Sequence, residues 1–160
     1  YMMSHGADGL KQVAEDAVLN ANYLRVRLAG ALSQSYPGTC MHEVLFDDRF
    51  LKDTGVTTLD FAKALIDEGF HPMTMYFPLV VHGAMLIEPT ETESKRELDR
   101  FCDALLALAK AAKAGDAERF LGAPYLAPLR RLDETLAARK PKLTWRPEPT
   151  TVAPAPLAAE

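Results

Sequence analysis

The 160-residue sequence contains only two cysteines, Cys40 and Cys102, and its N-terminus lacks the basic start, apolar run and cleavage site of a signal peptide. Two cysteines cannot form a disulfide scaffold, and together with the absent signal they favour a reducing, cytoplasmic setting. No apolar run approaches the roughly 18 residues that a membrane span needs. The sequence therefore predicts a soluble protein without a membrane partner.

Charge of one sign is also scarce, because 18 Lys and Arg stand against 22 Asp and Glu, for a formal net charge of −4. This balance offers no basic surface for nucleic acid. The composition, 48% hydrophobic and 25% charged, is that of an ordinary globular domain. The length fits one domain. Because the first residue is Tyr1, without a convincing initiator context, we expect the chain to be a piece of a longer protein.

Motifs for metal or nucleophilic chemistry are absent as well. The four histidines form no H-x-x-x-H or H-E-x-x-H pattern, and no C-x-x-C, G-x-S-x-G, Walker or G-x-G-x-x-G motif occurs. His42 and Glu43 are neighbours on a predicted strand, so they are expected to point to opposite faces. No metal site is predicted. Cys102 is interpreted as a buried apolar residue and Cys40 as a more exposed one, neither of them catalytic.

Apolar spacing and capping signals predict three helices. The first starts near residue 7, after a loop containing Gly6 and Gly9, and ends before residues 36–38 (YPG). The second starts at residue 57 or 58 and is closed by Gly69. The third begins at one of two capping boxes, 90–93 or 94–97, and stops near Gly115. Its inner face is predicted to hold Leu98, Phe101, Cys102, Leu105, Leu108, Ala109 and Ala112.

Strands are predicted at 41–46, 71–77 and 83–88. The order of elements predicts an α+β fold, in which a small mixed or antiparallel sheet carries helices on one face. Residues 1–146 are expected to form one domain, with an irregular basic extension over 116–146. Residues 147–160 are rich in Pro, Thr and Ala, which predicts a disordered tail.

Polar residues gather where the second and third predicted strands end, around 71–78 (HPMTMYFP) and 85–94 (MLIEPTETES). Strand ends at the rim of a sheet often form binding sites. The same residues also have a structural interpretation, in which Thr90 caps the following helix and Glu91 and Glu93 complement its dipole. Residue chemistry alone favours this structural interpretation.

Several of these segments resemble a known family. The motifs are AVLNANY at 17–23, MHE at 41–43, GFHP at 69–72, IEPTETES at 87–94, RLDE at 131–134 and ARKP at 138–141. Together and in this order, from Tyr1 to about Trp145, they look like the C-terminal part of glycine dehydrogenase (decarboxylating), the P-protein of the glycine cleavage system. The sequence is most similar to subunit 2 of the family's two-subunit form.

The resemblance implies a pyridoxal phosphate enzyme of the aspartate-aminotransferase fold type, which decarboxylates glycine and passes the aminomethyl group to the lipoyl arm of the H-protein. The implied partners are the large domain, subunit 1 and the lipoylated H-protein. In this family the cofactor lysine follows a histidine in the large domain, whereas no lysine of this sequence follows a histidine. We therefore expect this chain to be the small C-terminal domain, without the cofactor and inactive by itself.

In this fold type the strand-end loops of the small domain reach the cofactor cleft. The residues expected nearest the cleft are His71, Thr74, Tyr76, Phe77, Glu88, Thr90 and Glu91. Arg49 is a further candidate for binding a carboxylate, although a solvated loop arginine is the simpler interpretation. The competing hypothesis for the whole chain is a stand-alone α+β regulatory or partner-binding module without catalysis.

Overall fold

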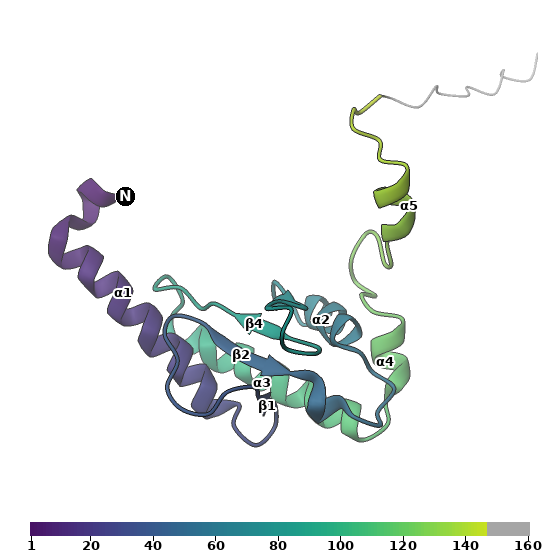
Figure 1. Cartoon of the computed structure of the whole chain (residues 1–160), viewed down its shortest axis with the longest axis horizontal. Coiled ribbons are helices and arrows are strands. Elements are labelled where there is room, and N and C mark those ends of the chain that lie inside the picture. Colours follow the sequence, from purple (N-terminus) through teal and green to yellow (C-terminus); the bar gives the residue numbers. More distant parts are fainter. Residues whose placement is uncertain (147–160) are drawn as a thin grey trace, which may run out of the picture.

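The computed structural model describes residues 1–146 and contains a small sheet with helices packed around it (Figure 1). Among these residues no helix is both long and apolar enough to cross a membrane. The tail predicted for 147–160 lies outside the described residues. The elements, in chain order, are α1 (Met2–Arg27), β1 (Ser33–Gln34), β2 (Val44–Asp47), the 3-10 helix η1 (Asp48–Leu51), α2 (Thr58–Asp67), β3 (Thr74–Met75), β4 (Met85–Ile87), α3 (Lys95–Lys113), α4 (Ala117–Leu121) and α5 (Glu134–Arg139).

The sheet has the strand order β1-β2-β4-β3, and every neighbouring pair is antiparallel. Side chains alternate across it: Val44 and Phe46 are buried, as is Met85 opposite Phe46, whereas the facing pair Leu45 and Leu86 is only half-buried. The buried face belongs to the same core as α1, α2 and α3. The predicted α+β fold is thus confirmed, with the antiparallel form of the sheet.

Aromatic rings join α2 to the elements on either side of it. The ring of Phe61 lies edge-on to Phe50 of η1, with centroids 5.3 Å apart, and is stacked on Phe120 of α4 at 6.2 Å. Phe61 and Phe120 have no exposed surface. Edge-to-face and parallel pairs of this kind add to the free energy gained from burial alone. The core therefore extends past α3 into the segment that follows it.

The helix ends predicted from capping residues are confirmed. The hydroxyl of Thr57 accepts from the backbone N–H of Asp60, whose carboxylate accepts in return from the N–H of Thr57. Of the two capping boxes proposed for α3, the later register is correct, because the Ser94 hydroxyl accepts from the N–H of residue 97. Gly69 and Gly115 follow α2 and α3 with φ of +84° and +85°, a conformation that glycine adopts without strain.

The predicted start of the first helix near residue 7 coincides with a break in α1, whereas its predicted end is wrong. The helix begins at Met2, and Gly6 interrupts it with φ 62° and ψ −171°, while Gly9 lies inside it rather than in a preceding loop. It ends at Arg27, well before residue 36, and Gly30 turns the chain with a φ of +85°. Leu32 is nevertheless buried, because the chain folds back over the core. The prediction extended the helix too far because the helical spacing of apolar residues continues past Arg27 into a turn that is not helical.

The strands are shorter than predicted, and β2 begins three residues later than expected, at Val44. The segment 116–146 is also more ordered than the predicted irregular extension. It contains α4 and α5, and the Arg131 guanidinium lies 2.9 Å from the carboxylate of Asp60. The Asp67 carboxylate accepts from the backbone N–H groups of Tyr125 and Leu126. The part up to Arg131 is therefore attached to α2 by specific contacts.

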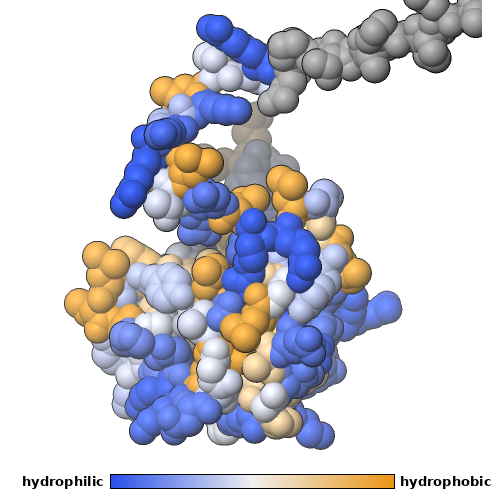
Figure 2. All heavy atoms as spheres, turned by 90° about the vertical axis from the view of Figure 1, so that its right-hand side faces the viewer, coloured by the Kyte–Doolittle hydropathy of each residue, from blue (hydrophilic) through white to orange (hydrophobic). Residues whose placement is uncertain are grey.

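Beyond Arg131 the chain leaves the body of the molecule, and α5 projects from it without a buried residue (Figure 1). Figure 2 shows this end of the molecule, where apolar patches interrupt a charged surface. The exposed large apolar residues of the segment 116–146 are Leu121, Tyr125, Leu126, Leu129, Leu132, Leu136, Leu143 and Trp145.

Candidate functional site

A cavity of about 500 Å³ opens between the end of β4, residues 69–74 and the first turns of α3. We call it the first cavity. One wall is apolar, because the rings of Phe70 and Phe101 meet edge to face at 5.3 Å. Three of the residues predicted from the sequence line this cavity, namely His71, Thr74 and Glu88.

The polar lining of the first cavity is predominantly acidic. Glu43, Glu88, Glu93 and Glu97 line it, and Arg100 is the one arginine among its lining residues. The guanidinium of Arg100 binds both carboxylate oxygens of Glu97, at 3.0 and 2.9 Å, and lies over the ring of Phe70. The positive charge of Arg100 is therefore paired with the carboxylate of Glu97. A hollow with an excess of carboxylates attracts cations.

A second cavity, of about 420 Å³, lies on the less buried face of the sheet, over Leu45 and Leu86. Phe77 lines it together with Tyr36 and Cys40. Partial burial raises the pKa of the Cys40 thiol. Cys40 therefore stays a protonated thiol at neutral pH, which is a poor nucleophile.

The other three predicted residues line neither cavity. Tyr76 has a φ of 58°, and its hydroxyl accepts from the backbone N–H of Leu59 at 3.2 Å. The carbonyl of Thr90 accepts from the Asn20 amide at 2.9 Å. The carboxylate of Glu91 accepts from the Tyr1 hydroxyl at 2.7 Å, and this hydrogen bond lowers its pKa. The seven predicted residues thus occupy four places rather than one, namely the two cavities, the start of α2 and the flank of α1.

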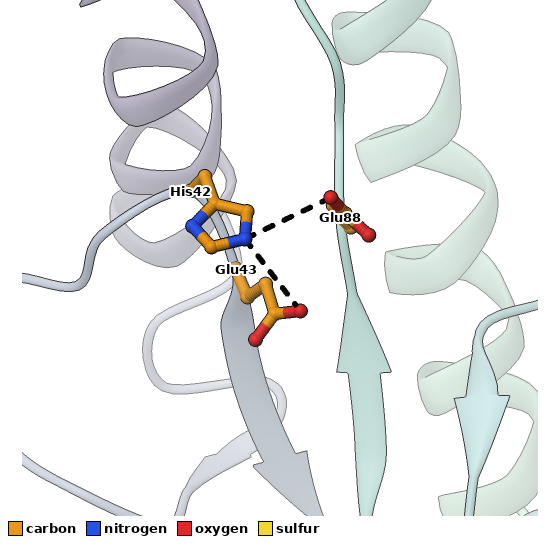
Figure 3. Close-up of side chains that lie close together, drawn as sticks. All are labelled: His42, Glu43 and Glu88. Atoms are coloured by element: carbon orange, nitrogen blue, oxygen red, sulfur yellow. Dashed lines mark ion pairs between the residues drawn. The ribbon is translucent and has the colours of Figure 1, made fainter. Parts of the chain in front are cut away.

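The structure brings together a cluster that the sequence pattern had separated. The Nε2 atom of His42 lies 3.8 Å from a carboxylate oxygen of Glu43 and 3.8 Å from one of Glu88 (Figure 3). The expectation that His42 and Glu43 point to opposite faces is wrong. It assumed the alternation of a strand, but β2 starts only at Val44, and both residues precede it. The pairing of two predicted strands, 41–46 and 83–88, was the signal that could have placed Glu88 beside them.

Two other candidates have structural roles. The Arg49 guanidinium binds the buried carboxylate of Asp47 at 2.8 Å and the carbonyl of Gln34 at 2.7 Å, so it ties η1 to β1. Cys102 lies on the buried face of α3, where burial raises its pKa to about 11. This agrees with its interpretation as an apolar core residue.

Comparisons with known families and proteins show which family the chain belongs to. A sequence model of the family described as "Glycine dehydrogenase, C-terminal domain" matches residues 13–120. Over its whole length, the chain is 76% identical to a Caulobacter vibrioides protein named "Probable glycine dehydrogenase (decarboxylating) subunit 2". A Kosmotoga olearia protein of the same name is 49% identical over 92% of the chain. The chain spans about 30% of the length of these curated relatives.

A solved structure has the same fold. It is the crystal structure of a glycine decarboxylase (P-protein) of the glycine cleavage system in an inhibitor-bound form. It matches 68% of this chain with a TM-score of 0.57 and 22% sequence identity, and the match covers 24% of the solved chain. At that identity the likeness establishes the fold alone.

Proposed function

Because the chain belongs to the glycine dehydrogenase C-terminal domain family, we propose that residues 1–146 form the small C-terminal domain of a glycine dehydrogenase (decarboxylating). The complete enzyme decarboxylates glycine with pyridoxal phosphate and passes the aminomethyl group to the lipoyl arm of the H-protein. The observation that carries this proposal is the 76% identity over the whole chain to a relative more than three times as long. A stand-alone regulatory module is not favoured, since the similarity places the chain inside a longer enzyme sequence.

The residues of this chain alone do not fit the cofactor. Pyridoxal phosphate supplies an electron sink when it is bound, and its protein site needs a lysine and a phosphate-binding group. Within residues 1–146 neither cavity is lined by a lysine. The first cavity is acidic, and its one arginine is bound to Glu97. The cofactor site therefore belongs to the part of the enzyme that precedes this domain.

The contribution of this domain is a wall of the glycine cleft. His71 and Thr74 both line the first cavity, and both side chains are exposed. Thr74 lies on β3, whose pairing with β4 fixes its position opposite Leu86. A hydroxyl on a paired strand is held more firmly than one on a free loop. Such a group can bind and orient a small polar substrate from one side while the large domain holds the cofactor on the other.

Further partners follow from the proteins that this chain resembles. The designation "subunit 2" supports a second subunit as a partner, and the solved P-protein of similar fold is a component of the glycine cleavage system. The substrate glycine and the lipoylated H-protein belong to the same proposal.

The test replaces Thr74 by alanine in the full-length enzyme assembled with subunit 1. Release of carbon dioxide from glycine is expected to fall about tenfold or more, while the melting temperature changes by less than about 2 °C, because the exposed hydroxyl stabilises little of the fold. Thr39→Ala is the matched control, since Thr39 is also exposed but lines the second cavity. Two results would contradict the proposal. One is a fall in the melting temperature of Thr74→Ala by more than about 2 °C, which would attribute the lost activity to unfolding. The other is the same loss of activity in both variants.

A further inference from the structure

We propose that His42, Glu43 and Glu88 form a binding site for a divalent transition-metal ion of the Zn²⁺ class at the rim of the first cavity. One imidazole nitrogen and a carboxylate oxygen from each glutamate lie within 4.8 Å of one another. Figure 3 shows the three side chains converging from the start of β2 and the end of β4. This proposal does not depend on the proposed function.

The backbone holds the two glutamates opposite each other. Val44 pairs with Ile87 in the antiparallel ladder, so residues 43 and 88 are the next facing positions beyond the end of the paired strands. Like charges at facing positions repel each other and destabilise a sheet. Within residues 1–146, the imidazole of His42 is the one basic group at ion-pair distance from either carboxylate, and it is charged only when protonated. A bound dication would neutralise both glutamates at once.

A second observation points to a cation at the same place. Glu43 and Glu88 line the first cavity together with Glu93, and the cavity's one arginine is engaged by Glu97. The cluster therefore stands at the mouth of an acidic hollow that concentrates cations. An ion held by three protein atoms would keep an open coordination position, as metal sites that bind a further ligand do.

The donor set selects the kind of metal. Imidazole suits Zn²⁺ and its neighbours in the first transition row, whereas Mg²⁺ prefers oxygen atoms alone. Around a tetrahedral Zn²⁺ ion, ligand atoms stand about 3.4 Å apart. The distances of 3.8 Å from His42 to each glutamate are close to this spacing. The side chains are 52%, 40% and 56% exposed, so small rotations can close the difference without disturbing the core.

The experiment titrates the full 160-residue chain, labelled with ¹⁵N, with Zn²⁺ alone. Nuclear magnetic resonance of the histidine rings reports each of the four imidazoles separately. We expect saturable binding of one ion per chain by calorimetry, with the ring signals of His42 shifting and those of His5, His71 and His82 unchanged. Excess Mg²⁺ is expected not to compete.

Variants separate this site from unspecific attraction. His42→Ala and Glu88→Gln are each expected to weaken Zn²⁺ binding about tenfold or more, because even changes behind the ligands have effects of that size. Glu93→Gln removes a charge from the same cavity outside the cluster and should weaken Zn²⁺ binding by no more than about twofold, because it takes away long-range attraction and no ligand. His82→Ala removes the imidazole paired with Asp48 and should leave Zn²⁺ binding unchanged. All four positions are exposed, and circular dichroism checks that each variant folds.

Three results would overturn the proposal. One is the absence of saturable binding in the unaltered chain. Another is equal weakening by Glu93→Gln, which would mean that the acidic cavity attracts Zn²⁺ without a defined site. The third is a shift of all four histidines together. In any of these cases His42 is an ion-pair partner for the two glutamates and not a metal ligand.

Discussion

Replacing Phe120 by alanine tests whether the segment after α3 belongs to the core. The ring is fully buried and stacked on Phe61, and Ala123, three residues further along the chain, is buried as well. Truncation of a buried phenylalanine to alanine destabilises a domain by about 3 to 5 kcal/mol, because the apolar contact and the filled volume are both lost. For a domain of this size, that loss lowers the melting temperature by about 10 to 16 °C.

The matched control is Leu121→Ala, one position along the same helix, where the side chain is 56% exposed. It should change the free energy of unfolding by no more than about 0.5 kcal/mol. Urea denaturation followed by circular dichroism measures both variants, and an unchanged slope shows that the compared states are the same. A loss below about 1 kcal/mol for Phe120→Ala, equal to that of the control, would refute the placement of α4 in the core.

Three other outcomes are expected. Burial alone would raise the pKa of Asp47, but hydrogen bonds from Arg49 and Ser35 outweigh it and hold the pKa below its ordinary value. The stability from this carboxylate is therefore present above about pH 4 and lost as the pH falls through the lowered pKa, so Asp47→Asn should flatten the acid limb of a plot of unfolding free energy against pH. Incubation of the chain with pyridoxal phosphate and then borohydride should leave no stoichiometric adduct on one lysine by mass spectrometry; such an adduct would mean that this domain holds its own cofactor site. Sedimentation over an about tenfold range of concentration should show self-association, because Met3 and Leu19 of α1 are 100% and 66% exposed, and a strictly monomeric species would contradict this.

The sequence carried most information where one residue determines a local geometry. Thr57 was recognisable as a helix start, and Ser94 as one of two candidates, because their hydroxyls cap free N–H groups. Gly69 and Gly115 were recognisable as helix ends because they adopt positive φ. These signals act within a few residues. They depend little on the rest of the fold, and so α2 and α3 were predicted closely.

Features that depend on tertiary contacts were missed. The apolar spacing of Leu28 and Leu32 fits a helix, yet both are buried by a chain that turns at Gly30. Helix α4 has five residues, too few to show a period, and Phe120 is recognisable as a core residue only by its contact with Phe61.

The candidate sites show the same limit. Three of the predicted cleft residues do line one cavity, because His71 and Thr74 stand just before and at the start of β3 and Glu88 follows the end of the antiparallel strand β4. That they form a glycine cleft stays a prediction. His42 and Glu43 were assigned to opposite faces because the start of β2 was placed three residues too early. Both residues therefore lie outside the strand, where the alternation of side chains does not apply.

Helix α1 gives the domain a mechanical property. It is rooted in the core at Leu24 and Leu28, while its first half stands clear of the sheet as far as the break at Gly6 (Figure 1). At 1.5 Å per residue, the straight part is a rod of about 30 Å. A rotation of the helix by about 10° around its rooted end would move the break at Gly6 by about 5 Å. Because the Tyr1 hydroxyl donates to the Glu91 carboxylate, such a rotation would pull on this hydrogen bond, which attaches the helix to the domain a second time at the end far from the core.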